Sequence, residues 1–204
     1  MTLYQTKFKK TEDIIIKALL EVGSTKSLAK ISISDISRVS GLSRGTFYLH
    51  FIDKDDLVKH INEEFLNAFQ EILDNQMNGT MSYQKLSTNK PYPVIISLVR
   101  LIANNRKLLA FLLGSNGDPK FLTAITAKLQ TAILKELESV KGVPKFRTDI
   151  PNEYAIKLVI NAILTIITTW LESKEDRMSQ FNVSMLIMKA LYLSPYDMLG
   201  IKDT

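Results

Sequence analysis

The sequence contains no cysteine and only two histidines. Without cysteine the chain has no disulfide, no thiol nucleophile and no thiolate ligands for zinc or an iron–sulfur cluster. Two histidines alone are too few ligands for a metal site. No Ser-His-Asp or paired-carboxylate arrangement stands out. The sequence therefore predicts no metal, no cofactor and no catalytic centre, so we do not expect an enzyme.

Proline and glycine are also scarce, with 6 and 8 among 204 residues. All six prolines lie beyond residue 90, and they separate apolar periodic segments instead of interrupting them. Apolar residues make up 46% of the chain, which is ample for a hydrophobic core. This composition excludes a disordered or collagen-like chain.

Long uninterrupted apolar runs are missing as well. The longest candidate, 154–171, has about the length of a membrane span, but polar side chains interrupt it at Lys157, Asn161, Thr165, Thr168 and Thr169. Residues 1–13 have no apolar stretch behind their basic residues, so no secretory signal is expected there. We therefore predict a cytoplasmic protein without a membrane helix.

Helical periodicity accounts for nearly everything that is present, which predicts an all-α fold. Ser32 with Asp35, and Asp53 with Asp56, have the spacing of helix N-caps. The predicted helices are 11–22, 33–40, 44–50, 54–76, 94–104, 106–113, 119–140, 153–173 and 182–193. Residues 77–93 lose the apolar rhythm and are expected to form a loop.

Positive charge is concentrated in the first part of the chain. The formal net charge is +5, and residues 1–60 carry ten basic and seven acidic side chains. This asymmetry weakly favours an acidic partner such as nucleic acid.

The segment 31–54 reads ISISDISRVSGLSRGTFYLHFIDK. Its apolar residues can form one small core, namely Ile36, Val39, Leu42, Phe47 and Phe51. Two short helices joined by a glycine-containing turn are typical of a helix-turn-helix, whose second helix enters the major groove. The spacing alone fits an ordinary helical corner equally well.

The stretch SGLSRGTFYLHF, followed by IDKDDL, resembles the helix-turn-helix of the TetR (AcrR) family of transcriptional regulators. The residues in register with the family pattern are Gly41, Ser43, Thr46, Tyr48, His50, Phe51, Lys54 and Leu57. One departure is Ser37, where the family usually has alanine. Residues 111–121 and 168–173 are less specifically similar to one subgroup of the family's C-terminal domains.

The resemblance implies two domains. A three-helix DNA-binding domain is expected over residues 1–53, and a larger helical domain for ligand binding and dimerisation over 54–204. The long helix 54–76 would connect them.

Outward residues of the helix-turn-helix then acquire DNA-binding roles. Arg44 has a planar fork of donors that suits the edge of guanine, and it begins the second helix. Gly45 lets the backbone approach the groove closely, and Thr46 can touch a phosphate or a thymine methyl. The remaining candidates, all expected to contact phosphates, are Ser34, Tyr48, His50 and Lys54.

The helix 153–173 is apolar nearly all round, so it must be covered on more than one side. A symmetric dimer would cover it with its own copy, and the helix 182–193 would complete a four-helix interface. The predicted interface residues are Leu158, Leu164, Ile167, Leu171, Leu186 and Leu191. The alternative is a helix buried wholly inside its own domain.

A small apolar ligand is expected beside the far end of the helix 54–76, where it could alter the spacing of the two recognition helices. The candidate lining residues, each of which could equally pack the core, are Phe65, Phe69, Phe111, Trp170 and Met185. We therefore expect a ligand-responsive repressor that binds a palindromic operator as a homodimer. The alternative is a TetR-like activator or co-activator whose C-terminal domain contacts another protein.

Overall fold

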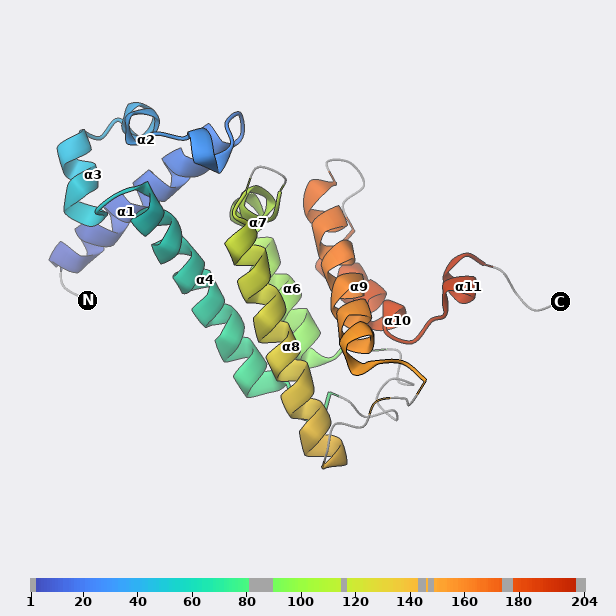
Figure 1. The fold of residues 1–204 in the computed structure, drawn as a ribbon. Helices are drawn as coiled ribbons and strands as arrows, with labels where there is room; N and C mark the ends of the chain where they lie inside the picture. Colours follow the sequence, from blue (N-terminus) through green and yellow to red (C-terminus); the bar gives the residue numbers. More distant parts are fainter. Residues whose placement is uncertain are drawn as a thin grey trace. The chain divides into compact units, whose positions relative to one another are not determined.

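The structure is a computed structural model that describes residues 3–80, 90–114, 117–142, 146, 149–173 and 178–200. Within these ranges helices are the only regular elements, which confirms the all-α prediction. They are α1 (Leu3–Gly23), the short 3₁₀ helix η1 (Leu28–Lys30), α2 (Ile33–Ser40), α3 (Arg44–His50), α4 (Lys54–Gln76), α6 (Pro93–Asn104), α7 (Arg106–Leu113), α8 (Pro119–Lys141), α9 (Asn152–Glu172), α10 (Gln180–Ala190) and α11 (Pro195–Met198) (Figure 1). Residues 81–89 of the predicted loop lie outside the described ranges.

The chain divides into two compact units. Unit 1 comprises residues 1–67 and 107–122, and unit 2 comprises 68–106 and 123–204. The helix α4 belongs to both, because apolar residues are buried along it from Leu57 to Leu73. This packing places the first part of α4 with the helix-turn-helix, whereas the sequence prediction begins a new domain at residue 54.

The helix α1 begins at Leu3, eight residues before the predicted start at Thr11. The Thr11 hydroxyl donates to the backbone carbonyl of Lys7 at 3.1 Å, so Thr11 lies inside the helix instead of capping it. The ring of Phe8 lies 3.9 Å from the ring of His50 in α3. We infer that this tertiary contact stabilises the polar first turns of α1. A contact between residues so far apart in the chain cannot be predicted from local sequence.

The helices α2 and α3 have the predicted bounds, and their ends show why. The Ser32 hydroxyl accepts from the Asp35 amide at 3.2 Å, and the Asp35 carboxylate accepts from the Ser32 amide at 3.1 Å. Gly41 ends α2 with a φ of 71°, a left-handed backbone conformation that residues other than glycine rarely adopt. Ser43 then caps α3 by accepting from the Thr46 amide at 3.0 Å.

A small core holds the helix-turn-helix together. Ile36, Phe47 and Phe51 are buried as predicted, whereas Val39 and Leu42 are half-buried. The α1 residues that are also buried in unit 1 are Ile15, Ala18, Leu19 and Val22. In Figure 1 the helices α1 to α3 lie around the beginning of α4.

In unit 2, α10 packs against both α6 and α9. Val99, Ile160 and Val183 from these three helices are buried. Ser179 caps α10 by accepting from the Asn182 amide at 3.1 Å, so the helix begins at Gln180, two residues before the predicted start. It ends at Ala190, three residues before the predicted end. The short helices η1 and α11 were not predicted, because neither is long enough to show a periodicity.

The helix α9 is long and apolar enough to cross a membrane, judged by length and composition alone. The core helix of a soluble protein passes the same test. In unit 2, α9 buries five apolar residues, namely Ile156, Ile160, Ile167, Trp170 and Leu171.

Candidate nucleic-acid interface

The short helix α3 has one buried side and one exposed side. Phe47 is buried, and the His50 side chain is only 6% exposed. The residues on the opposite side, Arg44, Gly45, Tyr48 and Leu49, are all exposed. Helical geometry places these four on one face, because each residue turns the helix by about 100°. This set is called the outward face of α3 below.

Arg44 and Ser34, two of the predicted DNA-binding residues, are brought together. The Arg44 guanidinium donates to the Ser34 hydroxyl across α2 and α3, and both residues are exposed. An arginine carries five N–H donors, so this bond leaves others available to a guanine edge. Ser34 is thus placed to orient Arg44 at the first residue of α3.

Gly45 has no internal reason to be glycine. A Cβ atom built there would meet only the Ser43 hydroxyl at 3.6 Å, an ordinary van der Waals distance. Its backbone is that of a normal helix, in which glycine costs up to about 1 kcal/mol relative to alanine. At Gly23, by contrast, a Cβ would lie 2.5 Å from the ring of Phe111. The packing inside the described structure therefore does not require a glycine at this position.

Thr46 and Tyr48 differ in how much they present to a partner. The Thr46 hydroxyl lies 2.9 Å from the Ser43 hydroxyl and is half-buried, so it takes part in the cap of α3. The Tyr48 side chain is 56% exposed, and its ring packs edge-on against Phe47 at 5.8 Å between centroids. Tyr48 presents its hydroxyl to solvent more readily than Thr46 does.

His50 is packed where a phosphate contact was predicted. Its ring lies against that of Phe8 at a tilt of 34°, and its Nδ1 atom lies 3.7 Å from a carboxylate oxygen of Glu12. That nitrogen is buried and has no hydrogen-bond partner among the described residues. This placement favours a role in fixing α3 against α1, and a direct phosphate contact of His50 stays a prediction.

Lys54 is engaged within the protein. Its Nζ atom donates to the backbone carbonyl of Leu28 at 2.8 Å and lies 3.4 Å from that of Ala29. The lysine therefore joins the start of α4 to η1. Local sequence does not predict this contact, because the two carbonyls belong to residues 26 and 25 positions before Lys54. Its predicted phosphate contact is untested.

A cluster of charges fixes the beginning of α2. The Asp35 carboxylate lies 2.8 Å from the Nζ atom of Lys26 and 3.5 Å from the guanidinium of Arg38. The hydrogen bonds from Lys26, and next from Ser32, hold the pKa of Asp35 well below its ordinary value. Asp35 is therefore ionised at neutral pH, where it both caps α2 and anchors the end of the turn after α1.

Ser37 is the position at which the sequence departs from the resemblance to TetR regulators. Its hydroxyl is buried without a hydrogen-bond partner among the described residues. A buried polar group that makes no hydrogen bond costs about 1–3 kcal/mol. We therefore expect the serine to destabilise the interior of the helix-turn-helix without changing its outward face.

Comparison with known proteins agrees with this geometry. Residues 15–61 match the family described as bacterial regulatory proteins of the tetR family, and residues 89–188 match a transcriptional regulator C-terminal region of TetR type. The chain belongs to the TetR family of transcriptional regulators. This family is a class of non-enzymatic DNA-binding transcription factors.

Curated relatives match this TetR-family chain over a short stretch. The HTH-type transcriptional regulator YvdT of Bacillus subtilis is 40% identical over 65 residues, which is 32% of this chain and 34% of YvdT. YwcC of the same organism is 34% identical over 61 residues, which is 30% of this chain and 27% of YwcC. The chain thus spans about a third or less of the length of these relatives.

Solved structures extend the likeness to nearly the whole fold. A TetR-family regulator from Syntrophomonas wolfei aligns with a TM-score of 0.61 at 19% identity, over 92% of this chain and 98% of that one. The fatty acid degradation regulator FadR from Bacillus halodurans aligns with a TM-score of 0.61 at 18% identity, over 89% and 95% of the two chains. At these identities the likeness establishes the TetR fold.

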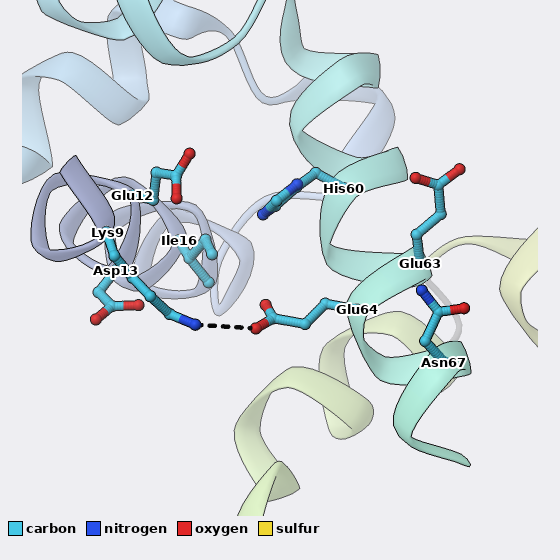
Figure 2. Close-up of a pocket in the computed structure, with 8 residues that line it drawn as sticks. All are labelled: Lys9, Glu12, Asp13, Ile16, His60, Glu63, Glu64 and Asn67. Carbon is cyan, nitrogen blue, oxygen red and sulfur yellow. Dashed lines mark hydrogen bonds and ion pairs between the residues drawn. The ribbon is translucent and has the colours of Figure 1, made fainter. Parts of the chain in front are cut away.

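A polar cavity of about 340 Å³ lies between α1 and α4 within unit 1 (Figure 2). Four carboxylates line it, with Lys9 and His60, and the Lys9 ammonium lies 3.5 Å from the Glu64 carboxylate. The carboxylates are Glu12, Asp13, Glu63 and Glu64. Across the described residues no group of three or more candidate ligands could hold a metal ion. The excess of negative charge makes this cavity unsuited to DNA phosphates.

The predicted dimer residues fall into two sets. Leu158 is 66% exposed, and Leu186 and Leu191 are also exposed. Ile167 and Leu171, by contrast, are buried inside unit 2, and Leu164 is half-buried. The chain itself already covers Ile167 and Leu171, so a partner subunit can only contact the other side of α9.

The predicted ligand residues are buried or half-buried in the described structure. In unit 1, the Phe65 ring lies 5.6 Å from the Phe121 ring, and Phe111 packs against Gly23. In unit 2, Phe69 is buried and Met185 half-buried, and the Trp170 indole N–H donates to the Met178 carbonyl at 3.0 Å. The Arg106 guanidinium lies 5.1 Å from the centre of the Trp170 ring. A ligand role for these five residues remains untested.

Proposed function

We propose that this TetR-family regulator is a cytoplasmic repressor that binds a partly palindromic operator as a homodimer and is released by a small molecule. The observation that carries the DNA-binding part is the outward face of α3. There Arg44 is exposed with donors to spare, and Gly45 leaves the backbone open although nothing inside the protein requires a glycine.

The outward face suits the major groove in shape and in chemistry. The fork of Arg44 can pair with the O6 and N7 atoms of guanine, which fixes one base per half-site. Contacts from Tyr48 and from basic side chains to phosphates would supply affinity that falls steeply with salt, because such contacts release counterions. Ser34 would hold the Arg44 fork in place, since the two side chains already bond.

A homodimer is supported by the apolar residues that α9 and α10 leave exposed. Tyr154, Leu158 and Phe181 are each more than half exposed. Apolar side chains at helical spacing on neighbouring helices suit burial against a second copy of the same two helices. A dimer would also present two copies of α3 to the two halves of a palindrome.

Ligand control is supported by α4, which begins beside η1 at Lys54 and continues into the core of unit 2. A ligand that binds unit 2 with different affinity in two states of the dimer would change the affinity for DNA. A specific observation keeps the activator or co-activator alternative open. Apolar side chains at the end of the described chain, Tyr196, Met198 and Leu199, are exposed and could contact another protein.

The test of the DNA-binding proposal is selection from a pool of random duplexes with the wild-type protein and with Arg44→Ala. We expect a partly palindromic motif for the wild type. For Arg44→Ala we expect a loss of about 1–3 kcal/mol and a relaxed preference at one base per half-site.

Arg100→Ala is the matched control, because it removes one exposed positive charge from α6 in unit 2. It should leave both the motif and the affinity nearly unchanged. An unchanged motif and affinity for Arg44→Ala would show that Arg44 does not read bases.

A further inference from the structure

We propose that Leu49 reads the C5-methyl group of a thymine in each half-site, an inference that rests on the DNA-binding function proposed above. Leu49 is 77% exposed and is the sixth of the seven residues of α3, a helix with a buried side. A single exposed leucine is common on protein surfaces, so its exposure alone means little. Its position on α3 is what carries the inference.

Leu49 lies one helical turn beyond Gly45 on the same face. Residues four apart in a helix are rotated by only about 40°, so Leu49 follows Gly45 along the outward face. Any surface that comes close to the backbone at Gly45 therefore also comes within reach of the Leu49 side chain. Arg44 and Tyr48 lie on one flank of Gly45, and Leu49 lies on the other, next to the half-buried Thr46. Leu49 is therefore the exposed apolar side chain of that flank.

The chemistry of the base edges determines which base Leu49 can contact. The base edges in the major groove present hydrogen-bond donors and acceptors and a single apolar group, the C5-methyl of thymine. A leucine side chain has neither donor nor acceptor, so it cannot satisfy the edges of guanine, adenine or cytosine. Covering one methyl group contributes about 0.8 kcal/mol, which is about a fourfold change in affinity.

Ile52 provides a matched control in unit 1. It is 80% exposed and equally apolar, but it lies two residues beyond the end of α3. Its backbone amide donates to the Asp56 carboxylate at 3.0 Å, so it belongs to the cap before α4. A general contribution of exposed apolar surface would affect both residues, whereas thymine reading concerns Leu49.

The experiment uses the operator selected by the wild-type protein and replaces its thymines one at a time by deoxyuridine, which removes only the methyl group. Wild type, Leu49→Ala and Ile52→Ala are titrated against each duplex. We expect one thymine per half-site at which uracil weakens wild-type and Ile52→Ala binding about fourfold. Leu49→Ala should bind the thymine and uracil duplexes equally. Replacing this thymine in both half-sites at once should weaken binding of the wild type about 16-fold.

Three results would overturn the inference. If Leu49→Ala weakens every duplex by the same factor and keeps its thymine preference, Leu49 packs on the sugar–phosphate backbone. If Leu49→Ala binds like the wild type and keeps the thymine preference, the leucine serves a partner other than DNA. If no duplex is selected at all, the proposed DNA-binding function itself fails, and the thymine inference falls with it.

Discussion

The helices α3 and α9 each bury one side and expose the other, but their exposed sides have different chemistry. The outward face of α3 combines Arg44, the Tyr48 hydroxyl and a glycine that leaves the backbone open with one apolar side chain, Leu49. The exposed side of α9 carries Tyr154, Leu158 and Val159 among its polar residues. A nucleic-acid partner requires donors and close approach, whereas a second protein chain requires apolar area.

The comparison teaches that exposure does not identify a partner until the chemistry of the exposed residues is considered. Both faces also depend on what lies behind them. Phe47 and His50 hold α3 from one side, and Ile160 and Ile167 hold α9. Changes on the exposed sides should therefore alter partners, and changes on the buried sides should alter stability.

The largest expected effect comes from a charge on the exposed side of α9. Leu158→Glu would bury a carboxylate in the proposed dimer interface, at a cost of about 3 kcal/mol or more in each subunit, and twofold symmetry doubles it. We expect a folded monomer by sedimentation, with much weaker operator binding. Val140→Glu, at an exposed apolar position of α8, should remain a dimer. A dimeric Leu158→Glu, or a wild type that is monomeric at micromolar concentration, would contradict the assignment of this side.

The second prediction tests whether ligand binding to unit 2 changes the affinity of unit 1 for DNA. A thermal-shift screen of small apolar compounds should find ligands, and each should lower operator affinity about 5- to 150-fold, the usual range of a coupling of about 1–3 kcal/mol. The measurement is a DNA titration with and without each hit. If every stabilising compound leaves the operator affinity unchanged, unit 2 serves dimerisation or protein contact, and the activator alternative becomes the better one.

The third prediction separates partner binding from stability at a single position. Gly45→Ala should raise the free energy of unfolding by up to about 1 kcal/mol, because alanine favours the helix and the site is open. The same change should weaken operator binding, because the added methyl group occupies the approach to the groove. Denaturant unfolding and DNA titration measure the two effects. A loss of both stability and operator affinity would show that Gly45 serves the fold, and an unchanged or higher operator affinity would show that no partner needs the open backbone.

The fourth prediction concerns the buried side of unit 1. Ser37→Ala removes a buried hydroxyl that has no partner among the described residues, so we expect an increase of about 1 kcal/mol in the free energy of unfolding. Operator affinity should stay the same, because Ser37 is not on the outward face. A loss of stability would mean that the hydroxyl is bonded in solution, for example by a water molecule.

The smallest effect is expected from acid. The pKa of Asp35 is lower in the folded protein than in the unfolded chain, so its stabilisation is present above the unfolded value and is lost as the pH falls through that value toward the folded one. Its partners Lys26 and Arg38 are exposed and screened by water, which keeps the effect small. Unfolding measured from pH 7 downward should show a weaker acid dependence for Asp35→Asn than for the wild type. Equal dependences would show that the hydrogen bonds from Lys26 and Ser32 do not lower the pKa of Asp35 in solution.

Much of this protein could be predicted from short stretches of sequence. The bounds of α2, α3 and α4 follow from residues within a few positions of each helix end, such as Ser32, Gly41 and Asp53. The family pattern around Arg44 and Gly45 is equally local. Capping hydrogen bonds and left-handed turns involve neighbours in the chain, so the order of residues alone encodes them.

Tertiary packing decided the rest. It extended α1 to Leu3 through the contact of Phe8 with His50, and it joined Lys54 to the carbonyl of Leu28. It also chose which side of α9 is covered, with Ile167 inside and Leu158 outside, although both are apolar. An apolar helix can be buried on any side, and only the placement of distant helices around it removes that freedom.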